Sequence, residues 1–316
     1  MLKKTLLAVL LAMVVAQSAS AQNTVRILVG FPPGGSADTT ARSIADKMKD
    51  SLGTPVLVEN RAGAGGRIAA QAVKDAAPDG NTLMLVPFAV MVVQPMVFRS
   101  IKYDTTADFT PIGNTVVFPL ALAAGPMTPA TNVKELVDWL RANPANANFG
   151  SPAAGSMPHF LGELLASAAK VKLTHVPFQG GAPLVANLLG AQIPIGFDTP
   201  AEFAEQHRAG KLRVLALSGA QRSAQFPGVA TFKEQGIDID ANAWFGLFGP
   251  ANIPRATVDR LNAALQAALK SPDVAERLEK LGLTVAPNSA DEMLRRLAAD
   301  KAVWNPVIRN SGFQAD

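Results

Sequence analysis

The sequence predicts an α/β protein of two lobes, each a mixed sheet flanked by helices, joined by two crossover strands. Strand-like and helix-like segments alternate almost throughout the 316 residues, a pattern typical of parallel or mixed sheets covered by helices. Two long strand-like stretches, near 112–124 and 243–249, bracket the middle of the chain. We therefore place lobe one at residues 22–122 and 247–316, and lobe two at residues 123–246.

The first residues predict a secretory signal peptide at 1–21. Lys3 and Lys4 precede a short apolar run, and Ala19-Ser20-Ala21 forms a cleavage site of small residues. We expect cleavage after Ala21 and a periplasmic mature protein that begins at Gln22. The chain contains no cysteine, so an exported protein of this kind must rely on a packed core rather than on disulfides.

Charge and motif content exclude several classes of function. The 29 Lys and Arg residues are scattered among 25 Asp and Glu residues, and the formal charge of +4 includes no basic run. We therefore expect no nucleic-acid partner. The glycine stretch 63–66 lacks the spacing of a dinucleotide loop, there is no phosphate-binding Gly-Lys-Ser/Thr motif, and the three histidines show no metal-ligand spacing. We expect no cofactor and no metal.

The predicted elements of lobe one follow one another through short turns. A β-branched strand at 25–29 leads through a Gly- and Pro-rich turn into a helix that ends at Gly53. One face of this helix carries the apolar residues Ala37, Ala41, Ile44, Ala45, Met48 and Leu52. A strand at 55–59, a helix around 68–73 and a strand at 82–86 come next. The apolar but poorly periodic region 88–103 predicts a loop with short helical pieces.

Lobe two and the end of the chain repeat the alternation. Asn132 and Glu135 have the capping-box spacing of a helix start, as do Ser289 and Glu292. Strands separated by helices are predicted at 148–151, 173–176, 193–197 and 212–217. Three helices close the chain, at 254–270, at 272–281 and after Ser289, and we expect them to pack on lobe one.

Four glycine-rich junctions between a strand and a helix are the candidate binding elements. They contain Gly34-Gly35, Gly63-Ala64-Gly65-Gly66, Gly155-Ser156 and Gly180-Gly181. The first N–H groups of a helix have no internal partner, and the helix dipole favours a negative charge there. We expect Ser36 to be the N-cap of its helix. If the lobes face each other, these junctions line one cleft and suit a small carboxylate, although a turn without a ligand remains the alternative for each.

Acidic residues and histidines near these junctions allow two interpretations. Asp198 follows the strand at 193–197, so it either faces the cleft and needs a donor or caps the next helix. Asp38 lies in a helix's first turn, where a carboxylate is stabilising in any case. The position of His159 in the first turns of a helix favours a structural hydrogen bond over the role of a catalytic base. No nucleophile motif is present.

Eight short motifs occur in order along the mature chain, at 29–38, 58–66, 77–83, 108–112, 151–159, 176–181, 210–213 and 244–246. They resemble the signatures of the Bug (Bordetella uptake gene) receptors, the periplasmic solute-binding proteins of tripartite tricarboxylate transporters. The resemblance implies a two-lobed, type II-like periplasmic binding fold that closes on a carboxylate, with waters bridging the ligand to lobe one.

Carried over by motif, the resemblance and the junctions together imply a set of ligand-contacting residues. These are Phe31, Pro33, Gly34, Gly35, Ser36, Asp38, Phe88, Ser151, Gly155, Ser156, Phe178, Gln179, Gly180, Gly181 and Asp198. Two departures matter: Phe178-Gln179 stands where the family usually has Tyr-Lys, and residues 87–93 are unusually apolar. Both favour a ligand with one or two carboxylates and an apolar or aromatic body over citrate.

We therefore predict a non-enzymatic, monomeric receptor that delivers a carboxylate to the membrane subunits of a transporter. Two alternatives stay open. A co-receptor that presents its ligand to a sensor kinase needs the same closed lobes, and an enzyme on the same fold lacks only a recognisable nucleophile and base.

Overall fold

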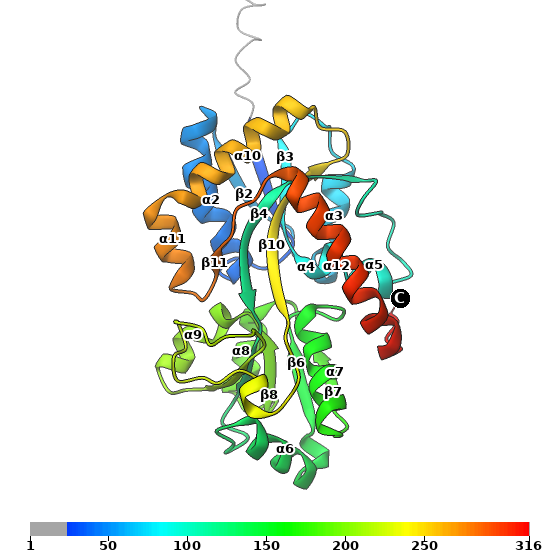
Figure 1. The fold of residues 1–316 in the computed structure, drawn as a ribbon, viewed down its shortest axis with the longest axis vertical. Helices are drawn as coiled ribbons and strands as arrows, with labels where there is room; N and C mark the ends of the chain where they lie inside the picture. The colour runs from blue at the N-terminus through cyan, green and yellow to red at the C-terminus, as the bar shows by residue number, and fades with distance from the viewer. Residues whose placement is uncertain (1–23, 316) are drawn as a thin grey trace, which may run out of the picture.

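The computed structural model describes residues 24–315, and the predicted signal peptide lies outside them. Two lobes, each built on its own sheet, are stacked along the longest axis and connected by two long strands (Figure 1). Both sheets are mixed and both carry helices, so the predicted α/β class and two-lobed architecture are confirmed.

The sheet of lobe one has six strands in the order β11-β4-β10-β3-β1-β2. They are β1 (Val25–Val29), β2 (Val56–Asn60), β3 (Thr82–Pro87), β4 (Phe109–Pro119), β10 (Asn242–Pro250) and β11 (Thr284–Val285). β1 pairs in parallel with β2 and β3, whereas β10 runs antiparallel to β3 and β4.

The helices of lobe one are α2 (Ser36–Leu52), α3 (Arg67–Lys74), α4 (Phe88–Met91), α5 (Gln94–Val97), α10 (Arg255–Lys270), α11 (Pro272–Glu279) and α12 (Ala290–Ser311). The apolar face predicted for the first helix is buried, apart from partly exposed Leu52, and Gly53 ends it in the left-handed conformation. The predicted capping box of Ser289 and Glu292 is present. Short helices stand within region 88–103, as expected.

The N-cap of α2 differs from the prediction. Gly35, in an extended conformation, precedes the helix, and Ser36 is its first residue. Ser36 therefore presents its backbone N–H, not its hydroxyl, as the first free donor of this helix.

The sheet of lobe two has five strands in the order β7-β6-β8-β5-β9. They are β5 (Ala121–Ala124), β6 (Asn148–Ser151), β7 (Thr174–Pro177), β8 (Ile195–Asp198) and β9 (Arg213–Leu217). Its helices are α6 (Val133–Ala142), α7 (Met157–Ala169), α8 (Gly181–Leu189) and α9 (Pro200–Arg208). Single 3₁₀ turns lie at Ala64–Gly66, Pro144–Asn146 and Lys233–Gln235. The side chain of Asn132 caps α6 by accepting from the Glu135 N–H.

The crossover strands β4 and β10 pair with each other from Pro119 and Asn242 onward, within the sheet of lobe one. The chain changes sheet slightly earlier than the predicted limits, at Leu120 and before Asn242. Buried Ser218 ties the two crossings together, because its Oγ accepts from the Leu120 N–H at 2.7 Å and donates to the Ala241 carbonyl at 2.5 Å. This hydrogen-bonded point is where the lobes join.

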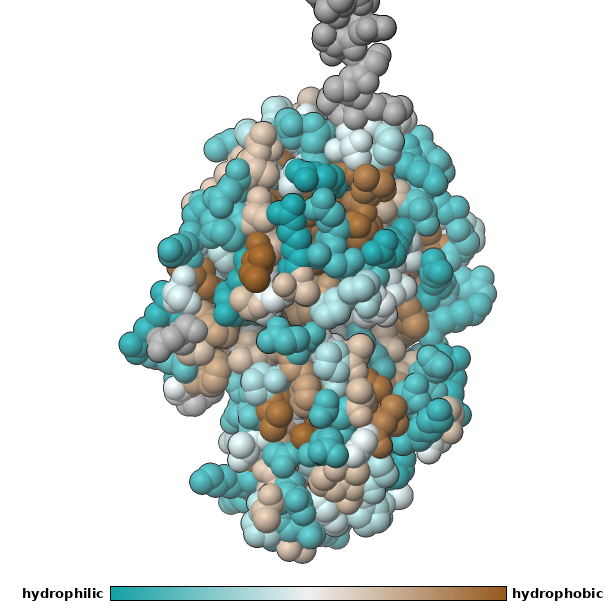
Figure 2. All heavy atoms as spheres, turned by 180° about the vertical axis from the view of Figure 1, so that it is seen from behind, coloured by the Kyte–Doolittle hydropathy of each residue, from teal (hydrophilic) through white to brown (hydrophobic). Residues whose placement is uncertain are grey.

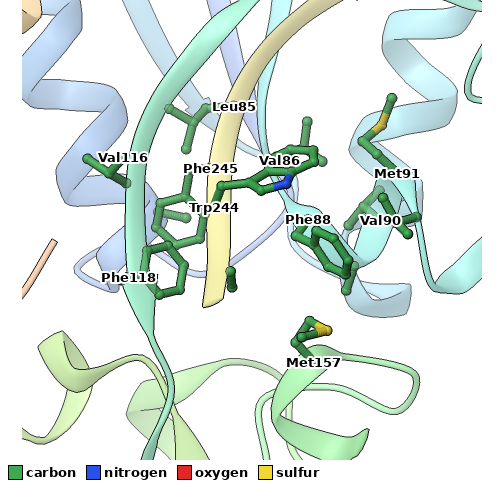
Figure 3. Packing of buried hydrophobic residues seen from close by; sticks show 14 of the residues in the cluster. Leu85, Val86, Phe88, Val90, Met91, Val116, Phe118, Met157, Trp244 and Phe245 are labelled. Atoms are coloured by element: carbon green, nitrogen blue, oxygen red, sulfur yellow. The ribbon is translucent and has the colours of Figure 1, made fainter. Parts of the chain in front are cut away.

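Apolar packing is continuous across the lobe junction. Phe88 of α4 packs edge-on against Trp244 of β10, with ring centroids 5.6 Å apart, and Met157 of lobe two points toward Phe88 (Figure 3). On the rear face the outline narrows between the lobes, and apolar residues are scattered among hydrophilic ones (Figure 2). Among residues 24–315, no helix is long and apolar enough to cross a membrane.

Candidate functional site

A cavity of about 80 Å³ lies between the two lobes. Lobe one contributes the turn after β1, the start of α4 and the crossover strands. Lobe two contributes the starts of α7, α8 and α9. The apolar part of the wall includes Phe31, Pro32, Phe88, Phe118, Leu120, Met157 and Phe245. The lobes are in contact around it, since the Thr199 hydroxyl lies 3.2 Å from the Ser36 hydroxyl.

Three of the helices that begin at this cavity start at a serine or a glycine. Ser36 at the start of α2, Ser156 at the N-cap of α7, and Gly180-Gly181 at the start of α8 all line it. Helix starts carry backbone donors without intrahelical partners and a partial positive charge. Their convergence makes this part of the cavity wall suitable for an anion.

One anion of the protein itself already occupies part of this wall. Glu202, in the first turn of α9, reaches across the lobe junction, and its Oε1 accepts a hydrogen bond from the Ser36 N–H at 2.7 Å. Burial raises the pKa of Glu202, and the hydrogen bonds from Ser36 only partly offset that effect. The carboxylate thus stands at the first N–H of α2.

Two further acceptors in the wall have no partner. Asp198 Oδ2 and Gln94 Oε1 are buried and form no hydrogen bond, although Asp198 Oδ1 accepts from the Thr199 N–H and Gln94 Nε2 donates to the Gly65 carbonyl. Burial, together with the nearby negative charge of Glu202, raises the pKa of Asp198 well above its usual range. Buried acceptors of this kind call for a donor.

Of the residues predicted to contact a ligand, several line the cavity: Phe31, Gly35, Ser36, Phe88, Ser156, Gly180, Gly181 and Asp198. The others lie outside its wall: Pro33, Gly34, Asp38, Ser151, Gly155, Phe178 and Gln179. The helix starts at Ser36, Ser156 and Gly181 are therefore next to the cavity, whereas many of the predicted side chains are not.

Two of the outlying residues have structural partners instead. Asp38 accepts hydrogen bonds from the Gly34 N–H, Arg42 and Asn60, which closes the turn after β1. Gly155, with φ +68°, shapes the turn before α7. Neither position needs a ligand to explain its residue type.

Phe178 and Gln179 also lie outside the wall, so they do not shape this cavity. The Phe178 ring packs over Gly150, where an added Cβ would lie 2.8 Å from it, and Gln179 is exposed. The apolar character of the cavity comes from Phe31, Phe88 and Phe245 instead.

Asp198 ends β8 and faces the cavity, while Thr199 is the N-cap of α9, so the capping alternative for Asp198 does not hold. His159 accepts from the Gly155 N–H through Nδ1 at 3.2 Å, which is the structural role predicted for it.

The structure does bring a serine and a histidine together, which sequence inspection did not detect. Ser151 Oγ lies 2.7 Å from His175 Nε2. The Ser151 hydroxyl also lies within hydrogen-bond distance of the Ala153 carbonyl, at 2.9 Å, and when it donates there it accepts from His175. Burial and the adjacent His159 lower the pKa of His175 to about 3. This pair lies outside the cavity wall.

Sequence reasoning missed Glu202 and Gln94. A glutamate in a first helical turn is ordinary dipole stabilisation, so Glu202 carried no signal except its position four residues after Asp198. Gln94 was the polar exception in an apolar run, which was a usable signal. In the described residues, no group of three or more His, Cys, Asp or Glu side chains could hold a metal ion.

The profile of the tripartite tricarboxylate transporter family receptors matches residues 40–313. This chain belongs to that family. BugT of Bordetella pertussis is 33% identical over 290 residues, covering 91% of this chain and 89% of BugT. The similarity extends to both lobes.

Solved structures of relatives show the same fold. MatC from Rhodopseudomonas palustris with bound malate is 31% identical, with a TM-score of 0.86 over 90% of this chain and 98% of MatC. Rpa4515 of R. palustris with adipate is 29% identical, with a TM-score of 0.88 over 92% of this chain and 98% of that one. The two-lobed periplasmic binding protein fold predicted for this receptor is thus confirmed.

Asp198→Asn is expected to raise the free energy of unfolding by about 1–3 kcal/mol near pH 7.5, because it replaces a buried, unpartnered carboxylate oxygen. Because the pKa of Asp198 is raised in the folded protein, ionisation of Asp198 lowers the free energy of unfolding as the pH rises. The contribution of the protonated Asp198 carboxyl to stability is fully present below the pKa of about 4 in the unfolded chain. It is lost as the pH rises toward the pKa of Asp198 in the folded protein. Denaturant unfolding at several pH values should therefore show the two proteins converging near pH 4. Asp50→Asn, at an exposed position of α2, is the control.

Proposed function

We propose that this chain is a periplasmic receptor that closes, as a monomer, on a small carboxylate and delivers it to the membrane subunits of a tripartite tricarboxylate transporter. Residues 1–21 act as the export signal. The lobes are close to those assigned from the sequence, with the ligand between them.

The observation that carries the proposal is the convergence of the starts of α2, α7 and α8 on one cavity between the lobes. Backbone N–H groups that hydrogen-bond a charged group contribute about 1.5–3 kcal/mol each. Three or four of them reach the roughly 8 kcal/mol of a micromolar complex. The two relatives solved with malate and adipate, both carboxylates, support the same class of ligand here.

The cavity wall supports an apolar ligand body. Phe31, Phe88, Phe118 and Phe245 line it, and burial against them contributes roughly 25 cal/mol per Å² of apolar surface. The cavity of about 80 Å³ is smaller than the roughly 150 Å³ cavity known to hold benzene. A short aliphatic carboxylate therefore suits the present arrangement of the lobes better than an aromatic carboxylate does.

The first test identifies the ligand. Native mass spectrometry of the protein purified from its host, followed by calorimetric titration, should find a retained or added carboxylate with micromolar or tighter affinity. The loaded protein should then capture the transporter's membrane subunits more strongly than the ligand-free protein does. If no mono-, di- or tricarboxylate binds, the proposed receptor function is wrong. If a carboxylate binds but only a sensor ectodomain is captured, the output is signalling.

A further inference from the structure

The carboxylate of Glu202 lies between the starts of two helices that belong to different lobes. Its Oε1 is 2.7 Å from the Ser36 nitrogen of α2. On the other side it faces Gly181, the first residue of α8, so closely that an added Cβ at Gly181 would lie 2.7 Å from Glu202 Cγ. An added Cβ at Gly35 would lie 3.3 Å from Oε1. Glycines on both sides therefore leave the space that this side chain fills.

The charged residues in the cavity wall are both acidic. Asp198 and Glu202 line it, and no Lys, Arg or His stands among the residues described as its wall. Asp198 Oδ2, on a residue only 4% exposed, has no hydrogen-bond partner, and neither has Gln94 Oε1, on a residue 1% exposed. Two buried oxygens in the wall therefore lack a hydrogen-bond partner, and the described wall supplies no cation to offset an additional carboxylate.

The helix starts are consequently shared between the protein and the ligand. Glu202 uses the first donor of α2, and the start of α7 at Ser156-Met157 remains for a ligand carboxylate. A second ligand carboxylate would have to displace Glu202 or remain in a wall that supplies no cation. Burying an unpaired carboxylate in such surroundings is strongly unfavourable.

We propose that Glu202 occupies the position of a second ligand carboxylate and thereby restricts this receptor to ligands that carry a single carboxylate. This inference rests on the proposed carboxylate-binding function and makes Glu202 a specificity-determining residue. It also explains why Glu202 crosses the lobe junction: the side chain contributes to closure a contact that a dicarboxylate would otherwise make.

Matched ligand pairs test the proposal directly. Hexanoate and adipate have the same number of carbon atoms, and lactate and malate differ by one added carboxylate. Calorimetric titration of the wild-type protein should favour the monocarboxylate of at least one pair by tenfold or more. In Glu202→Ala the vacated donor at Ser36 should strengthen binding of the matching dicarboxylate by at least tenfold and change monocarboxylate binding by less than threefold. Glu202→Gln, which removes the charge but keeps the shape, should show a smaller gain.

Glu205→Ala is the matched control, because Glu205 is exposed on the same helix and lies outside the cavity wall. It should leave all four affinities unchanged, and circular dichroism should show every variant folded. If the wild-type protein binds the dicarboxylate of each pair as tightly as the monocarboxylate, or if Glu202→Ala does not change their ratio, the role of Glu202 is refuted while carboxylate binding stands. If none of the four compounds nor any other carboxylate binds any variant, the receptor function itself fails.

Discussion

Trp244→Ala is expected to lower the free energy of unfolding by about 3–5 kcal/mol, the range for removing a large buried aromatic side chain. Trp244 is fully buried in crossover strand β10, packs edge-on against Phe88 and stacks on Phe248 with centroids 6.2 Å apart. The substitution also removes the donor of a 2.7 Å hydrogen bond from Trp244 Nε1 to Asp300 Oδ2. The partly buried Asp300 carboxylate then keeps its longer contact with Arg296, at 3.7 Å.

The measurement is chemical denaturation of wild type and variant, monitored by circular dichroism. Trp139→Ala makes the same chemical change at a partly exposed position on α6 and should lower the free energy of unfolding much less. Because Phe88 lines the cavity and rests on Trp244, ligand affinity should also fall in Trp244→Ala. A loss below 1 kcal/mol would contradict the packing described for the lobe junction.

Gly30→Ala is expected to lower the free energy of unfolding by about 3 kcal/mol, at the upper end of the range for overpacking. An added Cβ at Gly30 would lie 2.5 Å from the Gly66 Cα and 3.0 Å from its carbonyl oxygen. Both of these are backbone atoms, so no side chain can move aside. Either the end of β1 or the start of α3 has to shift.

This shift also reaches the cavity wall, because Phe31 follows Gly30 and its ring lies beside Gly66. Ligand affinity should therefore fall together with stability. Gly228→Ala is the control: Gly228 is exposed, is outside the left-handed region and has no atom within 4 Å of an added Cβ. Equal unfolding midpoints for Gly30→Ala and Gly228→Ala would show that the two backbone segments are not in contact.

Local chemistry accounts for most of what could be predicted about the fold. The strand at 25–29, the apolar face of α2, the caps at Asn132 and Ser289, and the alternation of strands and helices follow from residue spacing and capping rules, which act over a few positions. The positions of the helix starts in the site were predictable for the same reason. Ser36 was assigned to the wrong cap position because glycine and serine can both precede a helix.

What the sequence by itself determined is therefore the α/β class, the two lobes and the glycine-rich helix starts at Gly35, Ser156 and Gly180. Only the tertiary structure decided which side chains face the cavity, because that depends on how the two lobes meet. Phe178 packs over Gly150 of its own lobe, whereas Glu202 crosses to Ser36, 166 positions earlier in the chain. Neither hydrophobic periodicity nor a helix cap predicts a contact between residues so far apart in the sequence, since this hydrogen bond forms only where the surfaces of the two lobes meet.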